Sequence, residues 1–385
     1  MDVLTARVDP GAIERNCALL KEFVAPAGLL VAVKADGYGH GALTAARAAL
    51  AGGADAVGVA TPQEAEALLG GGFLGPILAW LWEPSQPVAG LLARGVELAV
   101  TSPAHARAVA AAGLGKRARV CLKVETGMHR NGIAEDDLPE AVRVLKSAGA
   151  TITGVMSHLA AADDPGDPAT DRQAARLSRA VETVRSLGVA APRTHLANSA
   201  ATLTRPDLHL DMVRVGIAAY GLQAMAPHVA PPRLAGRLEP ALSLIARVVD
   251  VRRLRAGDGV SYGLTWRAPA DGFAAVLPVG YADGLPRAAQ GLLTPTIRGT
   301  AYRQVGRVCM DQIVVWLGGN PHGVAPGDEA VLAGPGGTPV DVLARRLGTI
   351  SNEIVCAPKG RFRHETAPTE LSLIHISEPT RLRRI

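Results

Sequence analysis

The segment "VAVKADGYGHGA", residues 31–42, contains the features that decide how this chain folds. An apolar run, Leu29–Val33, has the length and the β-branched content of a buried strand, and it leads directly into Lys34. Glycines and polar residues follow at once, among them Asp36, Tyr38 and His40. A buried strand that ends on a lysine is typical of an α/β protein whose chemistry lies at the carboxyl ends of its strands.

The same pattern recurs along the chain, where short apolar runs alternate with segments of helical character. Eight such runs occur: LLVAVKA (29–35), DAVGVA (55–60), GPILAWL (75–81), VELAVTS (96–102), RVCLKVET (119–126), ITGVMSH (152–158), RTHLANS (193–199) and DMVRVGI (211–217). Thr61-Pro62 and Ser102-Pro103 have the N-cap and proline pattern that begins a helix. Strict alternation predicts a parallel sheet, and eight units favour an α/β fold with a closed (β/α)8 TIM-type barrel. A doubly wound open sheet remains the alternative.

The pattern changes after about residue 236, where strand-like runs are separated by Gly, Pro and Asp turns and only DVLARRLG (341–348) has helical character. We therefore predict a barrel over residues 1–235 and a mainly β C-terminal domain over residues 236–368. The Pro-rich segment 226–236 marks the boundary. Residues 371–385, "LSLIHISEPTRLRRI", differ in composition from the rest and resemble translated adaptor sequence, so we expect a non-native tail there.

Composition limits the class of protein. A hydrophobic content of 48% with 19% charged residues is that of a soluble globular enzyme. No run approaches the roughly 20 apolar residues of a membrane span, and the N-terminus lacks a secretory pattern, so we expect a cytoplasmic protein without a membrane partner. Four widely spaced cysteines without a CxxC pair argue against a disulfide framework and a zinc site, and we expect no metal. The net charge of +5 lacks an aromatic-interleaved basic patch, so we expect no nucleic-acid partner.

Polar groups stand at the ends of several predicted strands, and in a barrel these ends meet at one mouth. They are Lys34, Lys123–Thr126, His158, Asn198, Ser199 and Arg214. The loops after strands seven and eight of such barrels commonly form a phosphate site. Here those loops are "NSA" (198–200) and "RVGIAAYG" (214–221), which offer a hydroxyl, an amide and glycine N–H groups. The sequence therefore predicts a phosphate-bearing cofactor at this mouth.

Lys34 does not belong to a nucleotide loop. A P-loop places its lysine after the glycines, whereas Lys34 precedes them, and no acidic residue ends the next strand as a dinucleotide fingerprint requires. A lone strand-end lysine more often reaches solvent. At a barrel mouth, however, desolvation lowers the lysine pKa and favours Schiff-base chemistry.

Several segments together resemble the alanine racemase family, whose members depend on pyridoxal 5'-phosphate (PLP) and have fold type III. They occur in the family's order: AVKADGYGHG (32–41), LKVETGMHRNG (122–132), HLANSA (195–200), RVGIAAYG (214–221), VSYGLTW (260–266), PVGYADGLPR (278–287) and VGRVCMDQ (305–312). The resemblance extends to about residue 364 and implies a barrel followed by a β domain. It also implies an isomerase that interconverts L-alanine and D-alanine and supplies D-alanine for peptidoglycan.

The resemblance implies two acid–base groups, because racemisation removes a proton on one face of the substrate and returns one on the other. Lys34 holds PLP covalently and acts on the D-side. Tyr262, in the β domain, acts on the opposite face and enters the active site of the partner in a head-to-tail homodimer. Since a phenol with pKa near 10 is a poor base at neutral pH, nearby cations must stabilise its phenolate, and His158, Arg130 and Arg214 are the candidates.

The remaining implied roles divide into four groups. The implied cofactor contacts are Lys34, Tyr38, His158, Ser199, Arg214, Gly216 and Ile217, with Arg214 facing the pyridine nitrogen. The substrate contacts are Arg130, Met310 and Asn352. An entry corridor is formed by Asp164, Tyr281, Arg287 and Arg307. Lys123 matches a lysine that is carbamylated in some members and then supports Arg130. For Asp36 and His40 we expect only a role in shaping the turn and capping the next helix.

One position departs from the family. In "GTISNEIVC", Asn352 stands where the family usually has a tyrosine, and asparagine is smaller and can hydrogen-bond a substrate hydroxyl. Since losing such contacts costs only about 1 to 3 kcal/mol of selectivity, we expect alanine racemase activity broadened toward serine. A serine or broad-specificity racemase of the same family is the alternative.

Three other functions compete with racemisation. A non-catalytic PLP-carrier barrel would lack the β domain and Tyr262. A PLP decarboxylase of similar plan would lack the "SYGLTW" segment and an arginine facing the ring nitrogen. A carbohydrate-active barrel would need paired strand-end carboxylates, and Glu125 is the only clear one.

Overall fold

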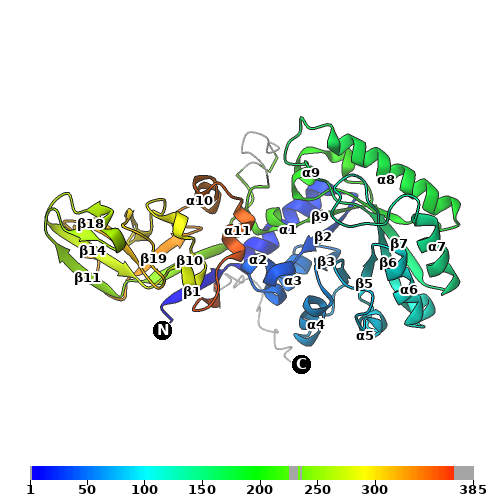
Figure 1. Cartoon of the computed structure of the whole chain (residues 1–385), viewed down its shortest axis with the longest axis horizontal. Helices are drawn as coiled ribbons and strands as arrows, with labels where there is room; N and C mark the ends of the chain where they lie inside the picture. The colour runs from blue at the N-terminus through cyan, green and yellow to red at the C-terminus, as the bar shows by residue number, and fades with distance from the viewer. Residues whose placement is uncertain (1, 225–232, 235, 368–385) are drawn as a thin grey trace, which may run out of the picture.

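The chain folds into two parts that lie end to end along the long axis of the molecule (Figure 1). The structure is a computed structural model, and it describes residues 2–224, 233–234 and 236–367. The predicted tail, residues 371–385, lies outside the described residues, as does most of the Pro-rich segment 226–236. Within the described residues, no helix combines the length and apolarity needed to cross a membrane.

The first part is a closed barrel of eight parallel strands in sequence order, and the predicted fold class is confirmed. Its strands are β2 (Gly28–Ala32), β3 (Ala56–Val59), β4 (Ile77–Ala79), β5 (Glu97–Val100), β6 (Arg119–Lys123), β7 (Thr151–Met156), β8 (Arg193–His195) and β9 (Met212–Val215). Pairing of β9 with β2 closes the barrel, with Gly28 opposite Met212. Each strand coincides with one of the eight runs predicted from sequence.

Helices cover the outside of the barrel, as Figure 1 shows. They are α1 (Pro10–Val24), α3 (Ala42–Ala51), α4 (Pro62–Gly70), α5 (Ala89–Ala93), α6 (Pro103–Ala111), α7 (Leu138–Ser147), α8 (Ala169–Ser186) and α9 (Ser199–Thr204). The short element α2 (Lys34–Gly39) follows β2 directly, and its backbone is left-handed. The predicted caps at Thr61 and Ser102 are confirmed, since both side chains accept a backbone N–H of the first helical turn. Glu64 completes a capping box with Thr61.

The inside of the barrel is a packed core of its own. Small and flexible apolar side chains fill it, namely Leu30, Leu78, Ala99, Cys121, Met156 and Met212. A much larger core cluster lies between the strands and the helices and continues into the second part of the chain. Since the interior is filled in this way, the barrel is not a pore, and a ligand must bind at an end of the barrel and not inside it.

The second part is mainly β, as predicted. One sheet has the order β16-β15-β19-β10-β1-β20, a second has the order β11-β14-β18-β17, and β12 pairs with β13. The strands are β1 (Leu4–Val8), β10 (Leu242–Arg247), β11 (Asp250–Leu254), β12 (Gly259–Val260), β13 (Trp266–Arg267), β14 (Gly272–Leu277), β15 (Thr296–Ile297), β16 (Thr300–Ala301), β17 (Gln304–Val305), β18 (Ile313–Gly318), β19 (Glu329–Ala333) and β20 (Arg363–Thr366).

Strand β1 shows that the two parts share the beginning of the chain. It pairs antiparallel with β10 and parallel with β20, so residues 4–8 lie in the β domain's sheet before the chain enters the barrel. The limits predicted from sequence assign this segment to the barrel part, because a five-residue strand carries no signal of its partner. The chain therefore begins in this β sheet, passes through the barrel and ends in the same sheet.

Two helices, α10 (Val340–Leu347) and α11 (Ser351–Cys356), lie between the barrel and the β sheets (Figure 1). The first is the helix predicted from DVLARRLG. The second was not predicted, and it packs against α2 at the mouth of the barrel. Its short sequence "SNEIVC" has too few residues to show helical periodicity, so tertiary packing decides its conformation.

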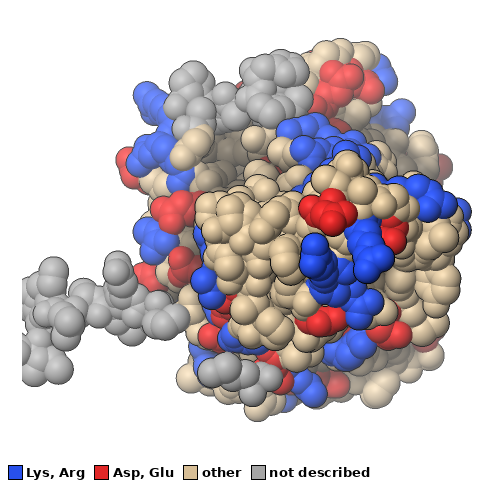
Figure 2. All heavy atoms as spheres, turned by 90° about the vertical axis from the view of Figure 1, so that its left-hand side faces the viewer, with Lys and Arg blue, Asp and Glu red and all other residues tan. Residues whose placement is uncertain are grey.

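Charged groups of both signs lie side by side on the end of the β domain shown in Figure 2. On β11, Arg252 forms an ion pair with Asp250 at 2.9 Å, and Arg298 pairs with Asp328 at 2.7 Å. Among the described residues, no three His, Cys, Asp or Glu side chains gather as a metal site would require.

Candidate active site

The segment after strand β2 forms a left-handed turn. Five consecutive residues, 35–39, have φ between 52° and 75°, although only two of them are glycine. Each non-glycine residue in this conformation costs roughly 1 to 2 kcal/mol. At Gly39 a side chain is impossible, because a Cβ atom would lie 2.1 Å from the backbone oxygen of Val355 in α11. Such a strained turn persists only where its surroundings hold it in place.

Two carboxylates hold this turn, one at its start and one beyond its end. Glu64 Oε1 accepts the N–H of Ala35 at 2.7 Å, and its Oε2 accepts the N–H of Ala60 at 2.7 Å. Asp36 Oδ1 accepts the N–H of Ala42 at 2.7 Å, at the first residue of α3. The prediction that Asp36 caps the next helix is thus confirmed.

A cavity of about 960 Å³ opens at the carboxyl ends of the barrel strands. Most of the residues predicted for the site line it: Lys34, Tyr38, Lys123, Arg130, His158, Ser199, Arg214, Gly216, Ile217 and Asn352. The cavity has further lining residues that were not predicted, among them Trp80, Asn131 and Arg345. Trp80 could have been found from its place at the end of strand β4, and Asn131 from its place beside Arg130.

Lys34 occupies an environment that favours its neutral amine. Its Nζ lies 5.9 Å from the ring centroid of Trp80 and 6.0 Å from that of Tyr38. Burial lowers the pKa of Lys34, and the positive charge of Arg130 lowers it further. A lysine with a lowered pKa is a better nucleophile toward a carbonyl, as the sequence analysis expected.

Hydroxyl and backbone N–H groups meet at the ends of β8 and β9. Ser199 Oγ accepts the N–H of Gly216 at 2.9 Å and lies 3.4 Å from the N–H of Ala218. The Tyr38 hydroxyl lies so close to Gly216 that a Cβ there would be 2.4 Å from it. Burial raises the pKa of Tyr38, so its phenol stays protonated and can donate a hydrogen bond. This group of donors is suited to an anion such as phosphate.

Arg214 has an unused donor within the site. Its Nη2 donates to the backbone oxygen of Ser157 and lies 3.4 Å from His158 Nδ1. Its Nη1 is buried and has no hydrogen-bond partner among the described residues. Burial lowers the pKa of Arg214 to about 10, which still leaves the guanidinium charged at neutral pH. Because buried donors are nearly always paired, this atom calls for an acceptor, and a ring nitrogen of a bound cofactor is one that fits.

His158 is buried beside Arg214, and this environment disfavours a further positive charge. Burial, followed by the charge of Arg214, lowers the pKa of His158 to about 3, so the imidazole is neutral at physiological pH. Burial and Arg130 likewise lower the pKa of Lys123 to about 8. Lys123 Nζ donates to Asn131 Oδ1. Arg130 and Arg214 bring guanidinium groups to the same cavity, and a pKa of about 8 leaves Lys123 mostly protonated at pH 7 as well.

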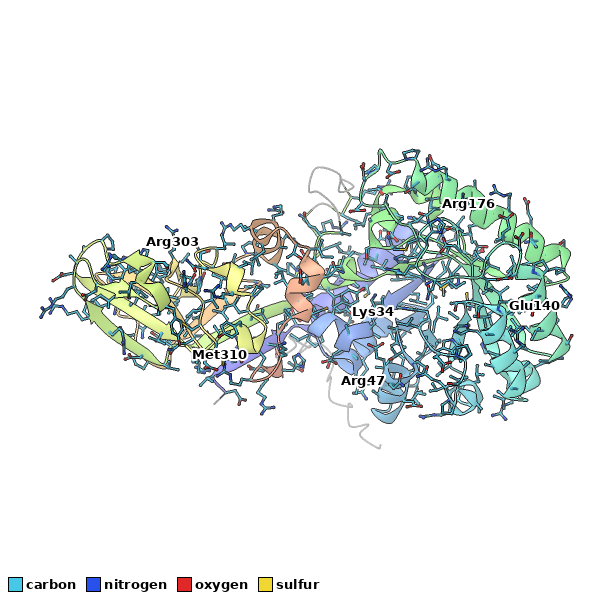
Figure 3. The ribbon with its side chains drawn as sticks, viewed as in Figure 1. Lys34, Arg47, Glu140, Arg176, Arg303 and Met310 are labelled. Atoms are coloured by element: carbon cyan, nitrogen blue, oxygen red, sulfur yellow. The ribbon has the colours of Figure 1, made fainter. Side chains whose placement is uncertain are left out.

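The structure does not bring the remaining predicted residues to this cavity. Tyr262, Met310 and Tyr281 are 71%, 51% and 42% exposed on the β domain. Figure 3 shows Met310 on that domain, well apart from Lys34 in the barrel. Arg287 and Arg307 also belong to the β domain, and Asp164 is exposed on the loop after β7.

The β-domain residues instead share one surface. Ser261 Oγ, beside Tyr262, donates to the backbone oxygen of Arg307 at 2.8 Å. The N–H groups of Tyr281 and Ala282 donate to the backbone oxygens of Cys309 and Met310, at 3.1 Å and 3.0 Å. Within one chain, therefore, the predicted acid–base pair Lys34 and Tyr262 is divided between two separate surfaces.

Comparison with known proteins identifies the family. The model of the alanine racemase N-terminal domain matches residues 8–224, and that of the C-terminal domain matches residues 241–366. The chain belongs to the alanine racemase family. Alanine racemase from Corynebacterium efficiens is 50% identical over 363 residues, which cover 94% of this chain and 97% of the relative. Alanine racemase from Mycolicibacterium smegmatis is 45% identical over 370 residues, covering 94% of each chain.

Solved structures of the family have the same architecture. The crystal structure of alanine racemase from Corynebacterium glutamicum has a TM-score of 0.85 and 42% identity, covering 95% of this chain and 100% of that one. Alanine racemase from D-cycloserine producing Streptomyces lavendulae has a TM-score of 0.88 and 36% identity, covering 95% and 97%. The barrel and the β domain of this chain are thus those of the alanine racemase family.

Proposed function

We propose that this chain interconverts L-alanine and D-alanine with PLP as its cofactor. The observation that carries the proposal is the unpartnered, buried Nη1 of Arg214, which shares one cavity with the desolvated Lys34 and the donors around Ser199. These groups fit the ring nitrogen, the aldehyde and the phosphate of PLP. Lys34 would hold the cofactor covalently, and Tyr38, Ser199, Gly216 and Ile217 would hold its phosphate.

When bound, PLP supplies the electron sink at the substrate's α-carbon, and a charged Arg214 keeps the ring nitrogen neutral and that sink weak. The chain's own residues move the proton. Lys34 Nζ takes it from, or returns it to, the D-side of the substrate. A second group must act at the opposite face.

For that second group we propose Tyr262 of the partner subunit in a head-to-tail homodimer. Its 71% exposure in its own chain supports this, because a phenol in such a position is free to enter another subunit. Its phenolate would be stabilised by Arg214 and Arg130, since burial lowers the pKa of His158 and favours its neutral form. The same surface would bring the backbone of Met310 to the substrate carboxylate, which Arg130 also anchors.

We propose that Asp164, Tyr281, Arg287 and Arg307 line the entry corridor once the dimer forms. Asp164 comes from the barrel and the others from the β domain, so the dimer is needed to bring them together. Lys123 is proposed as a carbamylation site. Its pKa of about 8 leaves a large neutral fraction at pH 8, and only a neutral amine reacts with carbon dioxide.

Asn352 lies on the wall of the same cavity, on helix α11. We propose that it broadens the specificity toward serine, because its amide can hydrogen-bond a hydroxyl. Comparison of kcat/KM for L-alanine and L-serine tests this, and undetectable turnover of serine would contradict it. We also propose that the enzyme acts in the cytoplasm and supplies D-alanine for peptidoglycan, which rescue of a D-alanine auxotroph would support.

The proposed function is tested on the purified protein. We expect an absorbance band near the visible edge that borohydride abolishes and that Lys34→Ala lacks, together with loss of optical rotation of L-alanine. Tyr262→Phe should keep the band and lose reaction chiefly from the L-side. Tyr302→Phe is the matched control, because Tyr302 is a buried tyrosine of the same domain. Full activity of Tyr262→Phe would refute the two-base assignment, and a band without racemisation would favour a PLP carrier.

A further inference from the structure

We propose that His40 is a positioning residue, which holds the left-handed turn of residues 35–39 in the shape that brings Lys34 and Tyr38 to one cavity. The inference rests on the proposed function of those two residues. His40 itself does not line the cavity, and it is 1% exposed. Its effect must therefore pass through the turn.

The imidazole of His40 binds the turn through one nitrogen. Nδ1 lies 2.8 Å from the backbone oxygen of Tyr38 and 3.0 Å from that of Gly37. Because both neighbours are acceptors, Nδ1 must carry the hydrogen. Nε2 is buried without a partner among the described residues, which fits a neutral ring with its hydrogen on Nδ1. Burial also lowers the pKa of His40 to about 4, so the ring stays neutral at neutral pH.

The ring of His40 also ties the turn to the end of strand β2. It packs on Tyr220 with centroids 4.4 Å apart, and Tyr220 packs on Tyr38 with centroids 5.1 Å apart. The Tyr220 hydroxyl donates to the backbone oxygen of Ala32 at 2.9 Å. Ala32 ends β2, two residues before Lys34. One stack of three rings thus joins the strand that carries Lys34 to the far end of the turn.

The hydrogen bond from His40 fixes the backbone of Tyr38, which belongs to the site. Tyr38 has a left-handed conformation, and holding its carbonyl oxygen also holds the backbone from which the phenol projects. Loss of the donor would remove this bond from the Tyr38 carbonyl, while the Gly37 carbonyl keeps the backbone N–H of His40 at 3.1 Å. The turn could then relax at Tyr38 toward an ordinary conformation. A shift of about 1 Å at reacting groups can lower a rate roughly 100-fold.

Three substitutions separate the donor from the bulk of the ring. His40→Phe keeps a ring against Tyr220 and removes the donor. His40→Asn places an amide nitrogen near the position of Nδ1, whereas His40→Gln places its amide at the position of Nε2, away from both carbonyls. The matched control is His105→Phe, because His105 Nε2 also lies 2.9 Å from a backbone oxygen, that of Trp82, and its ring packs on Trp82.

The full-length holoenzyme of each variant is compared in kcat, KM for L-alanine, PLP dissociation constant and melting temperature. We expect His40→Phe and His40→Gln to lower kcat at least tenfold and to weaken PLP binding at least tenfold, while His40→Asn stays within about threefold of wild type. The melting temperature should fall no further than in His105→Phe, whose kcat and PLP affinity stay unchanged.

Two results would overturn the inference. One is a His40→Phe or His40→Gln enzyme with kcat and PLP affinity within twofold of wild type. The other is equal loss in the Asn and Gln variants, since a donor at Nδ1 then has no special value. Failure of the proposed function is seen separately, because the wild-type chain would itself lack the PLP band and racemase activity.

Discussion

Lowering the pH from 7.5 to 5.0 should destabilise the barrel through three buried histidines, His40, His158 and His195. Burial lowers their pKa values to about 4, 3 and 3. Both ring nitrogens of His195 and Nε2 of His40 are buried without a partner among the described residues, so the folded state offers little to a second proton. The unfolded state binds that proton below pH 6.5. Stability from these groups is therefore complete above pH 6.5 and is lost as the pH falls toward their folded pKa values.

The loss of unfolding free energy follows from the difference between the pH and the pKa of about 6.5 that a histidine has in the unfolded chain. At pH 5.0 each unfolded histidine lies about 1.5 units below its pKa, which favours unfolding by about 2 kcal/mol. The three histidines together then remove about 6 kcal/mol. Carboxylates titrate near pH 4 in the unfolded chain and contribute little above pH 5. The histidines should therefore dominate this part of the pH profile.

Urea unfolding of the PLP-saturated protein at pH 7.5, 6.5, 5.5 and 5.0 measures the loss. His195→Asn removes one titrating group, and its profile should be flatter than that of wild type by about 2 kcal/mol. His322→Asn, at an exposed position of the β domain, is the control and should leave the profile unchanged. A wild-type free energy of unfolding that stays constant from pH 7.5 to 5.0 would refute the reasoning, as would a His195→Asn profile as steep as wild type.

Three further substitutions give direct tests. Asn352→Tyr should narrow the cavity and lower kcat/KM for L-serine about tenfold relative to L-alanine; an unchanged ratio would remove Asn352 from the specificity argument. Gly221→Ala should lower the free energy of unfolding in urea by more than about 3 kcal/mol, because a Cβ there would lie 1.8 Å from a backbone oxygen. Gly318→Ala is the control and should cost only about 1 to 2 kcal/mol, because Gly318 also has a positive φ but faces open space. Asp283→Asn should raise KM for L-alanine about tenfold with PLP affinity unchanged. The Asp283 carboxylate is 1% exposed, accepts hydrogen bonds from Arg361 Nε at 2.7 Å and Nη2 at 2.6 Å, and supports the turn that contacts Met310. Equal KM values for the variant and the wild type would contradict this.

Local signals were enough to predict most of the framework. The eight apolar runs form the eight barrel strands, because each run has the length of a buried strand and is too short for a helix. The caps at Thr61 and Ser102 depend only on neighbouring residues, so they too were predictable. Helix α11 was missed because its conformation depends on packing against α2 and not on its own six residues.

The candidate site divides in the same way. The sequence alone placed Lys34 and Arg214 at strand ends, since strand order and register put such residues at the mouth of a barrel. Charge states depend on burial and on neighbours that are distant in sequence, so only the structure could show that burial and Arg214 lower the pKa of His158.

The sequence by itself determined the barrel, the β domain and the lysine at the mouth, because each follows from apolar periodicity and from polar residues at strand ends. Only the tertiary structure decided the left-handed turn that presents Lys34 and Tyr38 together, the pairing of β1 with β10 and β20, and the separation of Tyr262 from Lys34 within one chain. The physical reason is that these features rest on contacts between segments far apart in the chain. The backbone of Val355 packs directly against Gly39, and residues 4–8 pair with residues 242–246 and 363–366.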